Sequence, residues 1–368
     1  MSTGNALVGS ITGVPSMGPP SVDEAFRRRK LASFLEENQR VVFRGTSAQN
    51  AEIRRILGWE PATLERFVSS TMLVNSSTHV SMNAFPPMLA FPWACQRIAD
   101  SSGASGEAVH LRTELTHNNL SDNRWKPNVW WHYGRDRRLA QVHLFSKQRQ
   151  FKHQILLAQP IPDVPTGNAS DLDRRALALA ACATNYAYFC MIYRTALEHA
   201  AGMHRLGHFL EVPINLLNEF FLSSEDSGRW RTAMRAKGFS FRAVGDDNEL
   251  HEVEHPIKGT FTTCHNYLNM GQVYLLGLSV SVGAERMLTY ESEMNTVITE
   301  FMASAGIDFR TPRFLGIPHL AIDEVFEVSE PLGTDLSDAG IRLSLPVLIG
   351  AFGTDISKTL DRLLSDAR

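Results

Sequence analysis

The stretch from Leu172 to Gly202 constrains the fold most, because it is long, apolar and rich in alanine and leucine. These residue types favour a helix, and Asp171 and Asp173 at its start suit the positive end of a helix dipole. Apolar residues at helical spacing then predict helices from Pro213 to about 228, over 267–304 and over 345–365. The carboxy-terminal half is therefore predicted to be a helical bundle.

The amino-terminal half predicts a mainly helical extension in front of this bundle. Residues 21–73 repeat apolar positions at helical spacing, and 101–144 is a mixed stretch. Between them Pro86, Pro87 and Pro92 block a helix, since proline lacks the amide donor. Prolines at 160, 162 and 165 indicate a boundary within 145–170. We expect a flexible leader over 1–22, a mainly helical region over 23–150 and the bundle over 151–368.

Charge and hydropathy exclude several classes of partner. The chain carries 36 basic and 39 acidic residues, for a net charge of −3, whereas nucleic-acid binding needs a basic surplus. The most apolar run, Val273 to Ala284, is too short to span a bilayer. The first twenty residues lack Lys, Arg and a continuous apolar core, which argues against a secretory signal. We expect a cytoplasmic protein with no nucleic-acid or membrane partner.

The segment from His319 to Phe326 contains the strongest candidates for functional residues. His319 and Asp323 are four residues apart and Phe326 is three further, so all three share one helical face. The simplest interpretation is an amphipathic helix with a solvated acidic face. Glu and His that point into one bundle from different helices also build non-haem iron or manganese sites, because buried carboxylates need a cation.

The segment around His319 and Asp323, the helix that contains Glu291 and the terminal apolar helix together resemble the haem-oxygenase-like diiron oxidases and oxygenases. In that family a late helix carries His-x-x-x-Asp-x-x-His, and earlier helices supply glutamates and further histidines. The resemblance covers about 170–368. It implies a haem-oxygenase-like helical bundle in which Glu198 and Glu225 are ligands from two earlier helices.

By the same resemblance Glu291, His319 and Asp323 complete the metal site, with Glu285 as an alternative to Glu291. Two positions depart from the family. Phe326 replaces its last histidine, and no histidine stands between 229 and 238. A carboxylate-rich site with one histidine suits manganese, magnesium or a single iron. Replacement ligands for the missing histidines are His199, His204 or His208.

The function that the resemblance implies is a metal-dependent oxygenase or oxidase, with iron or manganese, that uses dioxygen on a small-molecule intermediate of specialised metabolism. A homodimer is possible. The alternative is a metal-free protein of the same fold, either a cofactor-independent enzyme or a binding and assembly partner, in which Phe326 fills the former ligand position.

Weaker candidates stand elsewhere in the chain. They are Glu252 with His255, Cys264 with His265 as a haem ligand, the cluster Trp130, Trp131 and His132 with Asp122, and the basic runs 27–30 and 135–138. For each, a structural role is the simpler interpretation: a loop, the core or a solvated face. Four cysteines without Cys-x-x-Cys spacing indicate buried thiols. No nucleotide-binding, serine-hydrolase or zinc-protease motif is present.

Overall fold

The structure is a computed structural model of the whole chain. It describes residues 18–83, 86–104, 106–117, 127–133, 135, 139–146, 155–200, 207–225, 227–254, 261–263, 266–284 and 287–317.

Five strands form a central sheet that is parallel throughout. They are β1 (Met72–His79), β2 (Ala108–Leu115), β5 (His208–Pro213), β9 (Val280–Ala284) and β10 (Arg313–Ile317). Their order across the sheet is β10-β9-β1-β2-β5. In β9, Val280, Ser281 and Val282 are all buried, so this strand has no solvent-facing side. Burial on both faces is the rule for a parallel sheet, whose crossover connections cover it with helices.

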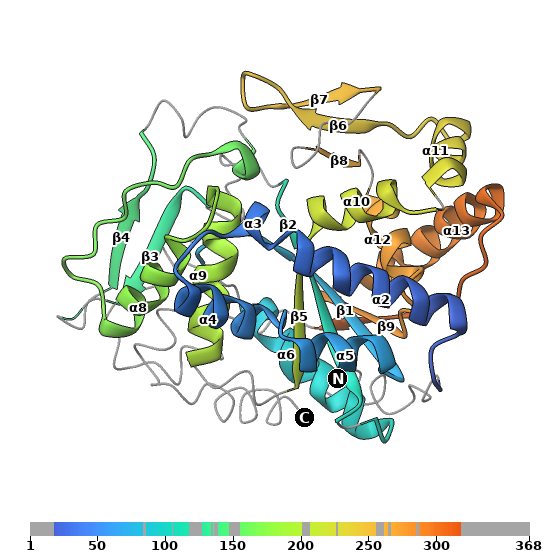
Figure 1. Ribbon diagram of the computed structural model, residues 1–368, viewed down its shortest axis with the longest axis horizontal. Coiled ribbons are helices and arrows are strands. Elements are labelled where there is room, and N and C mark those ends of the chain that lie inside the picture. Colours follow the sequence, from blue (N-terminus) through green and yellow to red (C-terminus); the bar gives the residue numbers. More distant parts are fainter. Residues whose placement is uncertain are drawn as a thin grey trace.

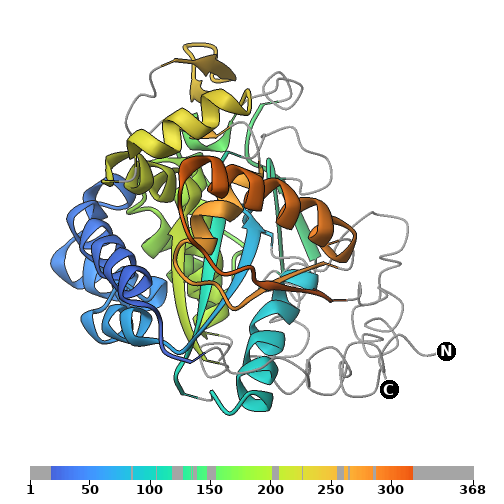
Figure 2. The same cartoon turned by 90° about the vertical axis from the view of Figure 1, so that its right-hand side faces the viewer.

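The sheet is doubly wound. From β1 the chain builds outward through β2 to β5, and then returns to add β9 and β10 on the other side of β1. The strand order therefore reverses between β1 and β9. Helix α6 (Pro86–Ser101) follows β1, and α13 (Met287–Ala305) connects β9 to β10. Helices lie on both faces of the sheet, with α6 and the amino-terminal helices on opposite sides (Figures 1 and 2).

The remaining helices surround this sheet. They are α2 (Val22–Glu37), α3 (Gln39–Val42), α4 (Ser47–Leu57), α5 (Pro61–Ser69), η1 (Leu156–Ala158), α8 (Asp171–Ala180), α9 (Tyr186–Ala200), α10 (Ile214–Ser223), α11 (Ser227–Ala236) and α12 (Asn266–Tyr274). Two of them begin with a capping box, Ser21 with Glu24 for α2 and Thr46 with Gln49 for α4. Each box satisfies backbone amides that the first helical turn leaves without partners.

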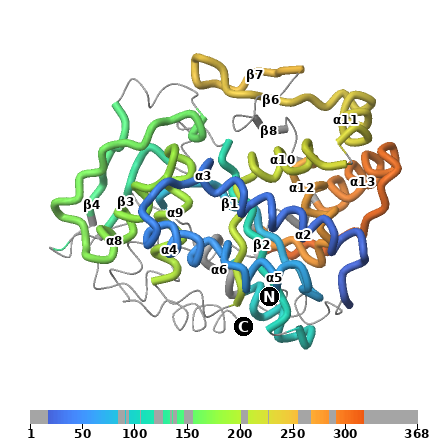
Figure 3. Tube along the Cα trace, in the orientation of Figure 1, coloured from blue at the N-terminus to red at the C-terminus, as the bar shows by residue number. Residues whose placement is uncertain are grey.

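A buried arginine on α2 forms hydrogen bonds with the end of α5 and with the segment between α12 and β9. The Arg28 guanidinium donates to the carbonyl oxygens of Phe67 (3.3 Å) and Ser70 (2.7 Å) at the end of α5. It also donates to Leu276 (2.7 Å) and Gly277 (3.2 Å) just beyond α12. A cation is favoured at helix carboxyl ends, where carbonyls lack amide partners. Figure 3 shows α2 running past α12, whose end these bonds reach.

The turn between α4 and α5 covers the outer edge of strand β5. Gly58 adopts a left-handed conformation (φ +74°) and ends α4. A Cβ atom at this position would lie 1.9 Å from the carbonyl oxygen of Phe209 in β5. Trp59 follows, and its indole Nε1 donates to the carbonyl oxygen of Glu211 (2.7 Å). The turn therefore covers the free edge of β5, so that no further strand can pair with it.

Two small antiparallel sheets complete the fold. One pairs β3 (Val129–Tyr133) with β4 (Leu139–His143). The other has the order β7-β6-β8, with β6 (Phe241–Val244) between β7 (Leu250–Val253) and β8 (Phe261–Thr263). Strand β8 contacts α10 and α12. In Figure 1 this second sheet lies above the central one.

The structure shows that the predicted fold class is wrong. The protein is a mixed α/β protein, and not a mainly α, haem-oxygenase-like bundle. The stretch 267–304, predicted as a helix, is α12, strand β9 and α13, because the apolar run at 273–284 supplies a strand buried on both faces. The single helix predicted from Leu172 is broken at 181–185 into α8 and α9. The helix predicted over 345–365 lies outside the described residues.

The helices predicted within 21–73 are present as α2 to α5. The prediction that Pro86, Pro87 and Pro92 block a helix is wrong, because all three belong to α6. Pro86 and Pro87 begin that helix, where a missing amide donor removes no helical hydrogen bond. The central sheet takes β1 and β2 from the region before residue 145 and β5, β9 and β10 from the region after 170, so the chain on both sides of the predicted boundary contributes to one sheet. Within the described residues no helix is long and apolar enough to cross a membrane.

Candidate functional site

The carboxyl edge of the central sheet is where a doubly wound fold places its ligand. Loops after neighbouring strands turn to opposite faces where the strand order reverses, and this leaves a crevice beside the strand ends. Here the reversal falls between β1 and β9. β1 ends at His79, and β2 is followed by Thr116 and His117. The residues just past these strands are therefore the first candidates for a binding site.

Polar side chains at this edge are buried. Those just past strand ends include Ser81, Asn83, Thr116, Asn215 and Asn218, each at most 2% exposed. The Thr116 hydroxyl donates to Asn215 Oδ1 (2.9 Å), and Asn215 Nδ2 donates to the Tyr188 hydroxyl oxygen (2.7 Å). This chain of hydrogen bonds joins the ends of β2 and β5 to α9. Burial raises the pKa of Tyr188, so its phenol keeps its proton.

A second buried amide ties the loop after β1 to strand β3. Asn83 Nδ2 donates to the carbonyl oxygen of Val129 (2.7 Å), and Asn83 Oδ1 accepts from the backbone amide of Trp131 (3.0 Å). Beside it the His132 ring stacks on Trp130, with ring centroids 4.0 Å apart. The β3–β4 ribbon is thus held against the same edge, and Trp130 and Trp131 serve as core residues.

The histidine just beyond β2 has unusual electrostatics. His117 is half-buried, and its Nδ1 atom has no hydrogen-bond partner among the described residues. Burial lowers the pKa of His117 to about 4, and the positive potentials of His79 and of Arg242 on β6 lower it further. At neutral pH this imidazole is uncharged. Arg242 forms no ion pair of 4.0 Å or less with a described residue, although Glu252 is its register partner on β7.

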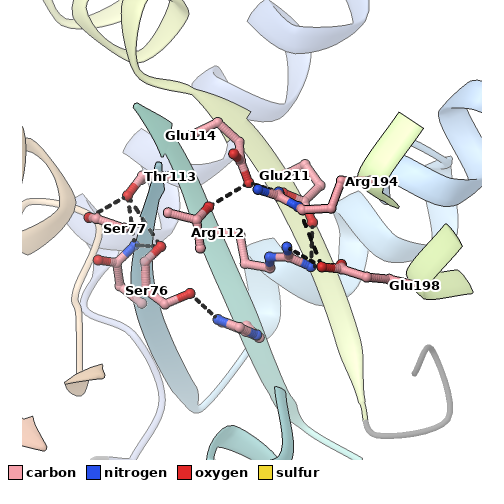
Figure 4. A network of polar contacts seen from close by, with 11 residues as sticks. Ser76, Ser77, Arg112, Thr113, Glu114, Arg194, Glu198 and Glu211 are labelled. Atoms are coloured by element: carbon pink, nitrogen blue, oxygen red, sulfur yellow. Dashed lines mark hydrogen bonds and ion pairs between the residues drawn. The ribbon is translucent and has the colours of Figure 1, made fainter. Parts of the chain in front are cut away.

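Beneath this edge lies a buried network of two arginines and three glutamates (Figure 4). Arg112 on β2 binds Glu198 of α9 through both terminal nitrogens and lies 3.0 Å from Glu211 of β5. Arg194 on α9 contacts Glu114 of β2, Glu198 (3.4 Å) and Glu211 (3.8 Å). All five side chains are at most 4% exposed. The network joins α9 to strands β2 and β5.

One proton balances the charge of this network. Two arginines and three carboxylates sum to −1, which is costly without water. Burial and the neighbouring Glu114 raise the pKa of Glu211 well above its ordinary value, although Arg112 and Arg194 oppose this. For Glu114, burial also raises the pKa, but Arg194 and Arg112 outweigh it and the net shift is downward. Glu211 is therefore the carboxyl of the network that most favours its protonated form, beside the Glu114 carboxylate.

The predicted metal ligands do not come together in the described residues. Glu198 is taken up by the ion-pair network, Glu225 is exposed in the turn after α10, and Glu291 accepts a hydrogen bond from the Phe314 amide (3.1 Å). His319, Asp323, Phe326 and Glu285 lie outside the described residues. No group of three or more His, Cys, Asp or Glu within the described residues is arranged to hold a metal ion.

The other candidate residues also have structural positions. His199 contacts Arg55 (2.8 Å), His208 begins β5 and Glu252 is exposed on β7. His204, His255, Cys264, His265 and Asp122 lie outside the described residues. In the basic run 27–30, Arg28 is buried, so that run is not wholly a solvated face.

Sequence reasoning missed the residues that the structure brings together. Along β2 the polar residues His110, Arg112 and Glu114 alternate with Val109 and Leu111. Such alternation indicates a strand, but it normally indicates one solvent-facing side. Here α9 covers the polar side, and its Arg194 and Glu198 complete the charges. Comparisons with protein-family models, curated proteins and solved structures find no match, so function rests on the site alone.

Proposed function

We propose that the protein binds an anionic small molecule, with a carboxylate or phosphate group, at the carboxyl edge of its sheet. The observation that carries this proposal is His117, a half-buried neutral imidazole with an unpartnered Nδ1 atom, whose pKa the potentials of His79 and Arg242 lower. His79 ends β1 and His117 follows β2, at the edge where a doubly wound fold places its ligand, and Arg242 on β6 acts electrostatically on His117.

An anion is the occupant that this electrostatic arrangement favours. The positive potential of Arg242 opposes protonation of His117 and is not offset by an ion pair to a described residue. A unit negative charge about 4 Å away contributes roughly 4 kcal/mol at an effective dielectric constant of 20. Such a charge would raise the pKa of His117 by up to about 3 units. Anion binding and proton uptake by His117 are thus coupled.

The same imidazole suits proton transfer. A neutral histidine in a partly dry site accepts a proton from a bound acid, and Arg242 then stabilises the anion that remains. The residues Thr116, Asn215 and Tyr188 hold the loops at this edge in place.

Histidine NMR tests the proposal directly. Side-chain signals of His117, assigned with His117→Asn, are followed through a pH titration with and without inorganic phosphate or succinate. We expect the pKa of His117 to rise from about 4 when either anion is present. In Arg242→Gln, at least tenfold more anion should be needed for the same rise in the pKa of His117. Arg235 is an exposed arginine on α11, and Arg235→Gln should leave the required anion concentration unchanged. An unchanged His117 pKa with both anions rejects the proposal.

The earlier expectation of an iron- or manganese-dependent oxygenase stays untested. It derived from a helical-bundle resemblance that the parallel sheet contradicts, and no described residue favours it over anion binding. Three buried cysteines without disulfide partners, Cys95, Cys182 and Cys190, fit a reducing compartment such as the cytoplasm.

A further inference from the structure

A pocket of about 210 Å³ opens at the amino edge of the sheet, opposite the carboxyl-edge site. It lies between α6 and the first residues of β2 and β5. Its lining residues are Val74, Cys95, Gln96, Ala99, Gly106, Ala108, Val109, His110, Gly207 and His208. We refer to it as the amino-edge pocket. His110 and His117 stand near opposite ends of β2, so this pocket and the proposed anion site are separate.

The amino-edge pocket is open because several of its lining residues are small. Ala99 and Ala108 present only methyl groups, and a Cβ atom added to Gly106 would meet nothing within 4 Å. Val74 and Val109 add apolar walls. An apolar protein cavity of about 150 Å³ holds benzene, so the amino-edge pocket has room for a single ring or a small fused ring system.

No lining residue among those described is ionised at neutral pH. Burial raises the pKa of the Cys95 thiol, so the thiol keeps its proton. Burial and the positive potential of Arg112 lower the pKa of His110 well below its ordinary value. Burial also lowers the pKa of His208, followed by the potential of Arg66. A charged occupant would lose its hydration without a counter-charge, so the pocket favours an uncharged one.

One buried polar atom in the lining has no partner. His110 is 4% exposed, and its Nε2 atom lies 2.7 Å from the Ser76 hydroxyl. Its Nδ1 atom has no hydrogen-bond partner among the described residues. The Phe209 ring packs edge-on against the imidazole, 5.4 Å between centroids, and fixes its plane. A buried ring nitrogen without a partner costs free energy, which a hydrogen bond from an occupant would recover.

We propose that the amino-edge pocket binds an uncharged aromatic molecule of phenol to indole size, whose heteroatom forms a hydrogen bond with His110 Nδ1. The apolar walls contact the ring, and the imidazole recognises the hydroxyl or N–H group. Neither Arg242 nor His117 takes part, so binding here does not depend on the anion site.

Calorimetry with phenol, indole and benzene tests this proposal on the full chain. We expect phenol and indole to bind, and benzene to bind at least fivefold more weakly because it lacks the heteroatom. Ala99→Leu fills the pocket and should weaken all three at least tenfold. His110→Leu should weaken phenol and indole about tenfold and change benzene less than twofold. Ala236→Leu, on the exposed side of α11, is the matched control and should bind as the wild type does.

A second measurement does not depend on the variants folding. The His110 imidazole ¹⁵N signals of the wild type should shift when indole is added, and phosphate alone should leave them unchanged. The proposal is rejected if millimolar indole and phenol leave these signals unchanged, or if both folded variants bind indole as tightly as the wild type.

Discussion

At the scale of single residues, Glu211 is a group whose protonation the fold controls strongly. Its folded-state pKa lies above the ordinary 4.5, because burial and Glu114 disfavour its anion. The folded protein therefore retains a proton that the unfolded chain releases as the pH rises above about 4.5. The stability that this proton gives is complete below that pH and is lost as the pH rises through the folded-state pKa.

Glu211→Gln should consequently flatten the dependence of stability on pH. The amide resembles the protonated carboxyl in size and neutrality but has no proton to lose, so a slope of up to about −1.4 kcal/mol per pH unit disappears. Urea unfolding of both proteins from pH 5 to 9 measures this. The matched variant Glu114→Gln removes the carboxylate that faces Arg194 and should cost about 3–5 kcal/mol. Identical slopes in the wild type and Glu211→Gln would contradict the proton assignment.

At the scale of elements, the turn after α4 controls the edge of strand β5. Gly58→Ala should lower the free energy of unfolding by more than about 3 kcal/mol, because the new methyl group would overlap the Phe209 carbonyl oxygen in addition to straining a left-handed backbone. Gly103 has nearly the same backbone angle (φ +72°) and open space around it, so Gly103→Ala should cost only about 1–2 kcal/mol. Thermal melts of the two variants separate the effect of steric overlap from that of backbone strain. Equal losses of stability in both variants would argue against the contact with the Phe209 carbonyl oxygen.

The elements also show which parts of the fold could be read from the sequence. Helices α2, α4 and α5 could be predicted, because capping residues and helical spacing are local signals. Strand β9 could not, because a short apolar run has the same composition in a buried strand and a buried helix. The candidate site was missed for a related reason. His117 and Arg242 are far apart in sequence and belong to different sheets, so only the packing of the β7-β6-β8 sheet against the central sheet relates them.

At the scale of the whole molecule, the sheet depends on both halves of the chain. A chain that begins at Phe151 lacks β1 and β2, which are the central strand and its neighbour. It should show no cooperative melt by circular dichroism, since β5 loses its one partner strand and β9 keeps only β10. A chain that begins at Pro19 keeps the Ser21 cap of α2 and should melt as the full protein does. A cooperative melt of the shorter chain would contradict this view of the core.

The position of β1 also affects how the protein is made. One edge of β1 pairs with β2, but its other partner, β9, is synthesised about 200 residues later. At about 5–20 residues per second the ribosome needs roughly 10–40 s to deliver it. Throughout that interval the nascent chain presents an unpaired strand edge, and Arg28 still lacks the carbonyl acceptors of Leu276 and Gly277. The order of synthesis thus leaves the emerging amino-terminal half with an open strand edge, the feature through which unfinished chains aggregate.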